Sequence, residues 1–110
     1  MDAAIVCWDA KYTYYNPRPS QMDARIKTVT GLPNFPSYTS GHSTFSGAAA
    51  TILGYIIPSK AAAYTEMAKE ASLSRLYGAI HYRSDCEKGL EAGNKVGGYA
   101  KARALTDGAD

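Results

Sequence analysis

Three short stretches of this 110-residue sequence combine residue types that bind and process oxyanions. In the first stretch, Lys11 and Arg18 are seven residues apart, nearly two turns of helix, so both cations project from the same side. A guanidinium also presents a planar fork that bonds two oxygens at once. We therefore expect Lys11 and Arg18 to face a common anion, the ordinary alternative being two solvated cations on a surface helix.

The second stretch runs from Pro36 to His42 and opens a predicted helix. Free backbone N–H groups at a helix start bind anions, and Gly41 allows an anion close approach to the backbone. Ser40 adds a hydroxyl donor, and His42 is placed to give a proton to a leaving oxygen. The ordinary alternative makes Ser40 or Thr39 a helix cap and His42 a surface residue.

The third stretch contains Arg75, His81 and Asp85. His81 and Asp85 are four residues apart, which makes them neighbours on a helix. A carboxylate on one ring nitrogen fixes the tautomer and leaves the other nitrogen basic, as a nucleophile or metal ligand requires. Arg75 supplies a further guanidinium. Alone, the pair would be an ordinary helical His–Asp contact worth roughly a few tenths of a kcal/mol.

Taken together, the three stretches favour a functional site over three unrelated surface features. His42 and His81 are the only histidines in the sequence, and each accompanies a predicted anion-binding group. Three cations, a helix start, a proton donor and an oriented histidine are the components of a site for a phosphate-like oxyanion.

The elements that carry these residues are predicted to be helices. Apolar spacing and helix-stopping prolines predict four main helices, over about residues 3–15, 41–57, 59–78 and 83–105. No alternating strand pattern competes, so the fold class is all-α. The proline-rich connection over residues 16–40 is long enough to suggest a functional loop. The recurring glycines of the last helix predict a tightly packed face: Gly89, Gly93, Gly97 and Gly98. The expected inward positions of the third helix are Ala62, Met67, Ala71, Leu73 and Leu76.

Composition excludes several classes of protein. The chain is 45% hydrophobic and 20% charged, as a globular domain is, and its net charge of +2 is too small to indicate a nucleic-acid surface. No apolar stretch approaches the roughly 20 residues that a membrane span needs. No signal peptide is recognisable at the N-terminus, and the compartment stays open. We expect Cys7 and Cys86 to be free thiols, one disulfide being the alternative.

The order K-x6-R-P, P-S-x-x-S-G-H and S-R-x5-H-x3-D resembles the three-part signature of the type 2 phosphatidic acid phosphatase (PAP2) and vanadium-dependent haloperoxidase superfamily. All three parts are present, over residues 11–85. The resemblance implies an all-α helical bundle. It also implies a set of ligands for the oxygens of phosphate or vanadate: Lys11, Arg18, Ser40, Gly41 and Arg75.

The same resemblance implies roles for the remaining site residues. His81 would be the nucleophile in a phosphatase, or the axial ligand of vanadium in a haloperoxidase, where it would be the one metal ligand. Asp85 would orient His81. His42 would act as the acid–base group.

Two aromatic residues make the sequence more similar to the haloperoxidases than to the lipid phosphatases. Trp8 stands three residues before Lys11, and Phe35 occupies a position where chloroperoxidases carry Phe and bromoperoxidases carry His. In such enzymes these aromatic rings line the halide side of the site; the alternative is that both are core residues. The leading prediction is therefore a haloperoxidase with vanadate as cofactor and hydrogen peroxide and halide as substrates. An acid phosphatase that hydrolyses phosphate esters through a phosphohistidine, without vanadate, is the alternative.

The resemblance also predicts an incomplete bundle. In the family, further helices precede the first signature, whereas only ten residues precede Lys11 here. We expect residues 1–110 to be a single, partial domain that corresponds to the C-terminal part of the family bundle. Its exposed apolar surface would be covered in a homo-oligomer or by the rest of a longer chain. A second alternative follows, a non-catalytic fragment that retains an anion site.

Overall fold

The computed structural model describes residues 1–108, which form helices and loops without a strand. Four helices of 13 to 24 residues make up most of this part: α1 (Asp2–Tyr14), α3 (Gly41–Ile56), α4 (Ala61–Tyr77) and α5 (Arg83–Thr106). Two short elements, α2 (Pro19–Met22) and the 3-10 turn η1 (Pro58–Lys60), lie between them. The all-α class and the four predicted helices are confirmed, with ends that differ by only one or two residues.

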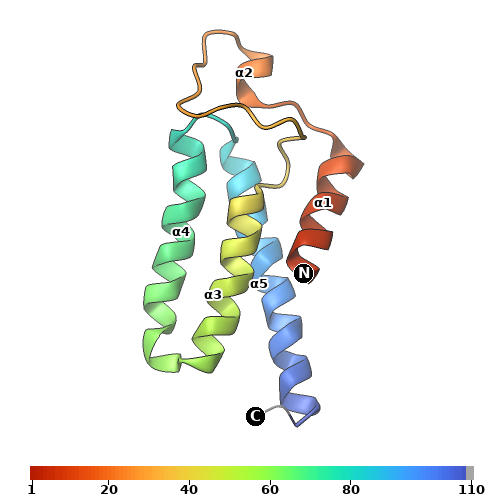
Figure 1. The fold of residues 1–110 in the computed structure, drawn as a ribbon, viewed down its shortest axis with the longest axis vertical. Coiled ribbons are helices and arrows are strands. Elements are labelled where there is room, and N and C mark those ends of the chain that lie inside the picture. The colour runs from red at the N-terminus through yellow and green to blue at the C-terminus, as the bar shows by residue number, and fades with distance from the viewer. Residues whose placement is uncertain (109–110) are drawn as a thin grey trace.

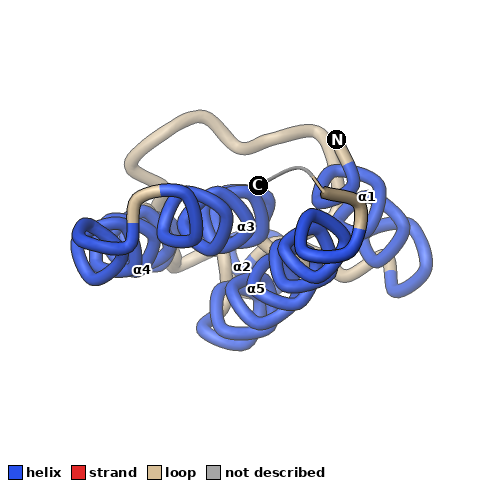
Figure 2. The backbone as a smooth tube through the Cα atoms, turned by 90° about the horizontal axis from the view of Figure 1, so that it is seen from below, coloured by secondary structure: helices blue, strands red, loops and turns tan. Residues whose placement is uncertain are grey.

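Helix α3 lies at the centre of the bundle, packed against both α4 and α5, while α1 contacts α3 and α5 (Figures 1 and 2). Helices α3 and α5 begin at the same end of the bundle, where α4 finishes (Figure 1). The connection between α1 and α3, which includes α2, crosses this same end. All three chemistry-bearing stretches of the sequence therefore meet at one end of the molecule.

A glycine face on α5 allows its close approach to α3. A Cβ atom at Gly89 would lie 2.8 Å from the Cβ of Ser43, and one at Gly97 would lie 2.7 Å from the Cβ of Thr51. The predicted packed face is confirmed for Gly89, Gly93 and Gly97, but it is wrong for Gly98, which has open space beside it. Because these glycines have no side chain, the α5 backbone lies directly against α3 from Ser43 to Thr51.

Replacing Gly93 with alanine is expected to lower the free energy of unfolding by at least about 3 kcal/mol, because the new Cβ would collide with the carbonyl oxygen of Thr44. The matched control is Gly98→Ala, which meets no atom within 4 Å and is expected to stabilise the helix by about 0.5–1 kcal/mol. Urea unfolding of both variants measures the difference. Equal stabilities for the two variants would contradict this packing.

The inward face of α4 differs from the prediction. Met67 and Leu73 are exposed, as is Ala62, and the buried positions are Ala68 and Ser72. Ala71 and Leu76 are half-buried. The reason is that α4 meets α3 through small side chains and a polar contact, with the Ser72 hydroxyl 2.7 Å from that of Ser43. Met67 and Leu73 consequently point outward, while Leu76 stays half-buried.

Large apolar side chains are exposed on several helices. The exposed fraction is 61% at Ile5, 63% at Ile56 and 64% at Met67. A partner copy or further chain that covers them stays a prediction. Within residues 1–108, no helix combines the length and apolarity needed to cross a membrane. The two cysteines, Cys7 and Cys86, are free thiols, as expected.

Candidate functional site

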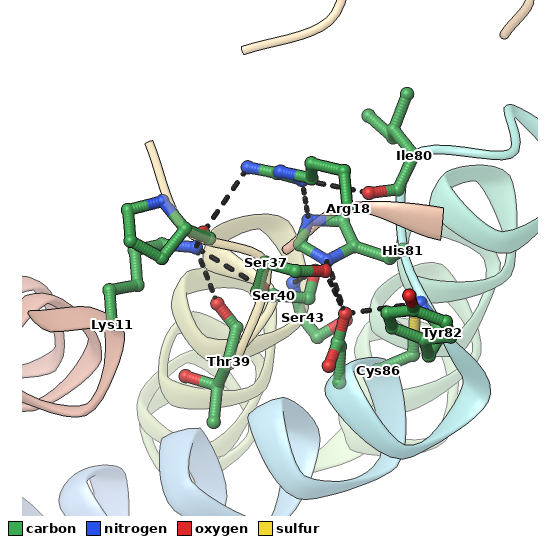
Figure 3. A network of polar contacts seen from close by, with 12 residues as sticks. Lys11, Arg18, Ser37, Thr39, Ser40, Ser43, Ile80, His81, Tyr82 and Cys86 are labelled. Carbon is green, nitrogen blue, oxygen red and sulfur yellow. Dashed lines mark hydrogen bonds and ion pairs between the residues drawn. The ribbon is translucent and has the colours of Figure 1, made fainter. Parts of the chain in front are cut away.

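The polar centre of the molecule is assembled at the end of the bundle from helix ends and the long loop (Figure 3). Lys11 comes from the last turn of α1. Arg18 is the N-cap of α2 and stands between Pro17 and Pro19. Its backbone is extended, as is favoured for a residue that comes directly before a proline, here Pro19. His81 lies just before α5, and Asp85 lies in its first turn.

Lys11 is buried, with 1% of its surface exposed, and it bonds to loop carbonyl groups. Its Nζ donates to the carbonyl oxygens of Pro36 at 2.9 Å, Thr39 at 2.7 Å and Ser37 at 3.4 Å (Figure 3). Burial is the main reason why the pKa of Lys11 falls to about 8, since a desolvated ammonium loses its hydration. Lys11 is thus charged at neutral pH and discharges just above it.

Arg18 is equally buried and reaches the histidine. Its Nη1 donates to the carbonyl oxygen of Ile80 and to His81 Nε2, each at 2.9 Å. Its Nε and Nη2 donate to the carbonyl oxygens of Phe35, at 3.2 Å, and Pro36, at 3.4 Å. Arg18 therefore ties the loop before α3 to the segment before α5.

The tautomer of His81 follows from these partners. A guanidinium only donates hydrogen bonds, so Nε2 must be the unprotonated nitrogen that accepts from Arg18. The proton then sits on Nδ1, which lies 3.0 Å from Asp85 Oδ2. Burial lowers the pKa of His81, against the opposing hydrogen bond to Asp85. The neutral imidazole thus keeps a lone pair on Nε2, on the side of the cations.

Asp85 has partners that the sequence analysis did not single out. The hydroxyl of Ser37 donates to Asp85 Oδ2, and so does the backbone N–H of Tyr82, at 3.1 Å. Burial alone would raise the pKa of Asp85, but the hydrogen bonds from His81, Ser37 and Tyr82 outweigh it and the pKa is lowered. Ser37 lies within the P-S-x-x-S-G-H stretch, and this position was the one feature of the sequence that could have indicated its role in the site.

Positive charge is in excess inside the site. Lys11 and Arg18 are both buried, Asp85 is the one buried carboxylate among residues 1–108, and neither cation forms an ion pair in that range. Burying a charge is costly unless it is compensated. In the described chain, no cluster of histidine, cysteine and acidic residues suits a metal cation. The buried positive charges fit an oxyanion, vanadate included, whose central atom would take the His81 Nε2 lone pair in place of the hydrogen bond from Arg18.

The start of α3 lies beside this centre. Ser40 caps the helix, its buried hydroxyl accepting from the N–H of Ser43 at 3.3 Å, and its own N–H donates to the carbonyl oxygen of Asp85 at 3.1 Å. A Cβ atom at Gly41 would have only Phe45 within 4 Å, so the first N–H groups of the helix stay approachable.

His42 and Arg75 form a second pair, separate in their contacts from Lys11, Arg18 and His81. His42 is exposed in the first turn of α3. Partial burial, with the positive charge of Arg75 as the second cause, lowers the pKa of His42. Arg75 lies half-buried in the last turn of α4, where its Nε donates to the Ser74 hydroxyl at 3.1 Å. The structure thus places both residues at the same end of the bundle, without joining them to the buried cations.

Trp8 and Phe35 lie directly against the cations. The Phe35 ring centroid is 5.1 Å from Lys11 Nζ and 5.2 Å from Arg18 Cζ, within range of a cation–π interaction with each. Trp8 meets Phe35 edge-on, with centroids 4.7 Å apart. Phe35 is 36% exposed and Trp8 is half-buried, so the two rings form a partly open wall of the site.

Comparison with known proteins agrees with this geometry. The model of the PAP2 superfamily matches residues 2–99, a range that contains every residue of the site. The protein belongs to the PAP2 superfamily. The matched range of this PAP2 chain includes all three segments that supply the site.

A solved structure also resembles this PAP2 chain. The crystal structure described as the first of a bacterial vanadium-dependent iodoperoxidase superposes with a TM-score of 0.79 at 36% sequence identity, over 89% of this chain. This chain spans 29% of the length of that iodoperoxidase chain. Among curated proteins, no sequence relative matches.

Proposed function

We propose that this PAP2 protein is a vanadate-dependent haloperoxidase that oxidises halide with hydrogen peroxide. The observation that carries the proposal is the excess of buried positive charge beside an unprotonated imidazole nitrogen. Lys11 Nζ donates to three loop carbonyls and Arg18 Nη1 donates to His81 Nε2, so an oxyanion would exchange these hydrogen bonds for bonds between its oxygens and the two cations, and would take the Nε2 lone pair for its central atom. A site of this kind favours a tetrahedral or trigonal oxyanion over a neutral substrate.

Vanadate would be held by residues from all three segments. Lys11, Arg18 and Arg75 would neutralise its oxygens, Ser40 and the Gly41 N–H would donate to them, and His81 would be its protein ligand. When bound, vanadate supplies Lewis-acid activation of peroxide without changing its oxidation state.

His42 would move the protons of the reaction, in which peroxide, halide and one proton give hypohalous acid and water. It stands in the first turn of α3, beside the predicted oxyanion donors, and it is exposed to exchange protons with solvent. Phe35 and Trp8 form the apolar wall toward which a halide, more weakly hydrated than the oxyanion, would approach. The similarity to the iodoperoxidase supports this branch of the superfamily.

Phosphate-ester hydrolysis is the second candidate, favoured by the neutral His81 with its unprotonated Nε2. His81 Nε2 would attack phosphorus while the ester oxygen leaves with a proton from His42, which gives a phosphohistidine. Water, deprotonated by His42, would then release phosphate. The same cations would stabilise the transferring group, so the two candidates differ in reactant and not in architecture.

The two candidates are separated by halide-dependent turnover. The protein is loaded with orthovanadate and assayed for dye halogenation by hydrogen peroxide, with bromide and with iodide, and in parallel for phosphate-ester hydrolysis without vanadate. Turnover that requires both vanadate and halide supports the haloperoxidase. Ester hydrolysis that vanadate inhibits supports the phosphatase. Oxyanion binding without either turnover indicates the non-catalytic alternative, a fragment that retains an anion site.

Oxyanion binding itself is expected to stabilise the fold, and to do so less as pH rises. Sulfate is a suitable probe because its charge is constant across neutral pH. At about 100 times its dissociation constant it should add about 2.7 kcal/mol to the free energy of unfolding, or roughly 10 °C in Tm for a domain of this size. Because the Lys11 pKa is about 8, the sulfate-induced shift should be full below pH 7 and decline above pH 8.

The sulfate-free stability should change in the opposite direction. Between pH 8 and the ordinary lysine range near 10.5, Lys11 binds more protons in the unfolded chain than in the folded one, so its contribution to stability increases with pH. Lys11→Met should remove both dependences, whereas Lys88→Met, at an exposed lysine, should remove neither. A sulfate shift that Lys11→Met leaves intact would contradict the predicted site.

A further inference from the structure

Ser37 is the residue at which the three segments of the site are joined. Its hydroxyl donates to Asp85 Oδ2, its N–H donates to the carbonyl oxygen of Asn16 at 2.8 Å, and its carbonyl oxygen accepts from Lys11 Nζ at 3.4 Å. Ser37 is fully buried, with 0% of its surface exposed. One residue therefore contacts the chain just before Arg18, the buried lysine and the carboxylate that faces the histidine. Figure 3 shows Ser37 between Lys11 and His81.

The hydroxyl of Ser37 also bears on the tautomer of His81. Its oxygen lies 3.4 Å from His81 Nδ1. A hydroxyl has one proton, and Ser37 gives it to Asp85, so the oxygen can only present a lone pair to Nδ1. Nδ1 thus faces two acceptors, Ser37 Oγ and Asp85 Oδ2, while Nε2 faces the donor-only guanidinium of Arg18. All three neighbours favour the proton on Nδ1, and each contributes to the tautomer.

One carboxylate oxygen of Asp85, Oδ2, accepts all the hydrogen bonds that orient the side chain. Three donors converge on Oδ2: the Ser37 hydroxyl, His81 Nδ1 at 3.0 Å and the N–H of Tyr82 at 3.1 Å. The Tyr82 donor belongs to the same helix start as Asp85 and holds the carboxylate toward its own backbone. Ser37 is the one donor of the three that comes from another segment and is not itself a reacting group.

We propose that Ser37 is a positioning residue, which holds the Asp85 carboxylate against His81 and so keeps Nε2 unprotonated on the side of the cations. This inference rests on the proposed function for its effect on turnover, but not for its effect on His81. Because the Ser37 carbonyl oxygen also accepts from Lys11, this one residue fixes the positions of both the histidine and a cation. An oxyanion would then meet a site whose lone pair and charges are already aligned.

The test measures the tautomer directly, with no need for turnover. Protein labelled with ¹⁵N-histidine is examined by NMR at pH 8, where burial leaves His81 neutral. The chain has two histidines, so a His42→Gln sample assigns both sets of ring nitrogens. In the wild type, His81 should show one protonated and one bare nitrogen. In Ser37→Ala, the difference between its two ¹⁵N shifts should shrink as the Nε2–H tautomer becomes populated.

Two further variants at position 37 and one control complete the test. Ser37→Thr keeps the hydroxyl and should restore the wild-type shifts, whereas Ser37→Cys offers only a weak donor and should behave as Ser37→Ala does. The control is Ser72→Ala, which removes another buried serine, bonded to Ser43 away from the histidine. It should leave the His81 shifts unchanged. Folded Ser37→Ala and Ser37→Cys variants with wild-type shifts would overturn the proposal.

Turnover supplies the second readout. Ser37→Ala should lower kcat by about 10- to 100-fold, the usual effect of losing a residue that orients a ligand, with a smaller change in KM. A wild-type protein without turnover would refute the proposed function, while the NMR comparison still decides the role of Ser37. Unchanged kcat in an active Ser37→Ala protein would overturn the positioning role.

Discussion

Replacing His81 with alanine is expected to abolish turnover, a loss of at least about 10⁴-fold in kcat. The imidazole is the one group of the site that can form a bond to a central phosphorus or vanadium atom, through the Nε2 that Arg18 and Asp85 keep unprotonated. The cations that remain can still bind an oxyanion, but nothing replaces the bond. Steady-state assays of halide oxidation and of ester hydrolysis measure the effect in either branch of the superfamily.

Measuring sulfate binding together with turnover separates a loss of catalysis from a loss of the anion site. His81→Ala should retain a sulfate-induced rise in Tm, since Lys11 and Arg18 remain in place. Ser72→Ala, another buried polar substitution, should retain full activity and so control for general disturbance of the fold. An active His81→Ala enzyme would end the catalytic assignment of this residue.

The second large effect is expected at His42, where alanine should lower kcat by about 10²- to 10⁴-fold through loss of the acid–base group. The pH dependence identifies this role. Partial burial and the charge of Arg75 lower the pKa of His42, so ester hydrolysis, which needs the protonated form, should decline as pH rises through a value below the ordinary imidazole range. His42→Ala should remove this decline.

Arg75 provides the matching comparison. Because its positive charge contributes to the lowered pKa, Arg75→Gln should move the alkaline decline of kcat to higher pH, in addition to weakening oxyanion binding. Lys69→Gln, at an exposed cation on the same helix, should leave the profile in place. A profile that neither His42→Ala nor Arg75→Gln changes would assign proton transfer to another group.

The residues of the site were predictable because their signals are local. Lys11, Arg18, His81 and Asp85 were identified from their spacing along single segments. The helical reason given for that spacing was wrong, because Arg18 lies beyond the end of α1 and His81 lies before the start of α5. The ends of the helices could also be predicted from the sequence, because a proline stops a helix whatever that helix packs against. The glycine pattern of α5 predicted its packed face for the same reason, because an absent side chain is visible in the sequence itself.

Contacts between segments were decided by the tertiary structure. Ser37 acquires its role only because the loop places it against Asp85, 48 residues further along the chain. The inward face of α4 was mispredicted because its neighbours require small residues, Ala68 and Ser72, where hydrophobicity suggested Met67 and Leu73. Sequence alone thus determined the helices and the chemical groups. Which of these groups share a hydrogen bond depended on how α3 and α5 pack. The partners lie on segments far apart in the sequence, and only tertiary packing brings such segments together.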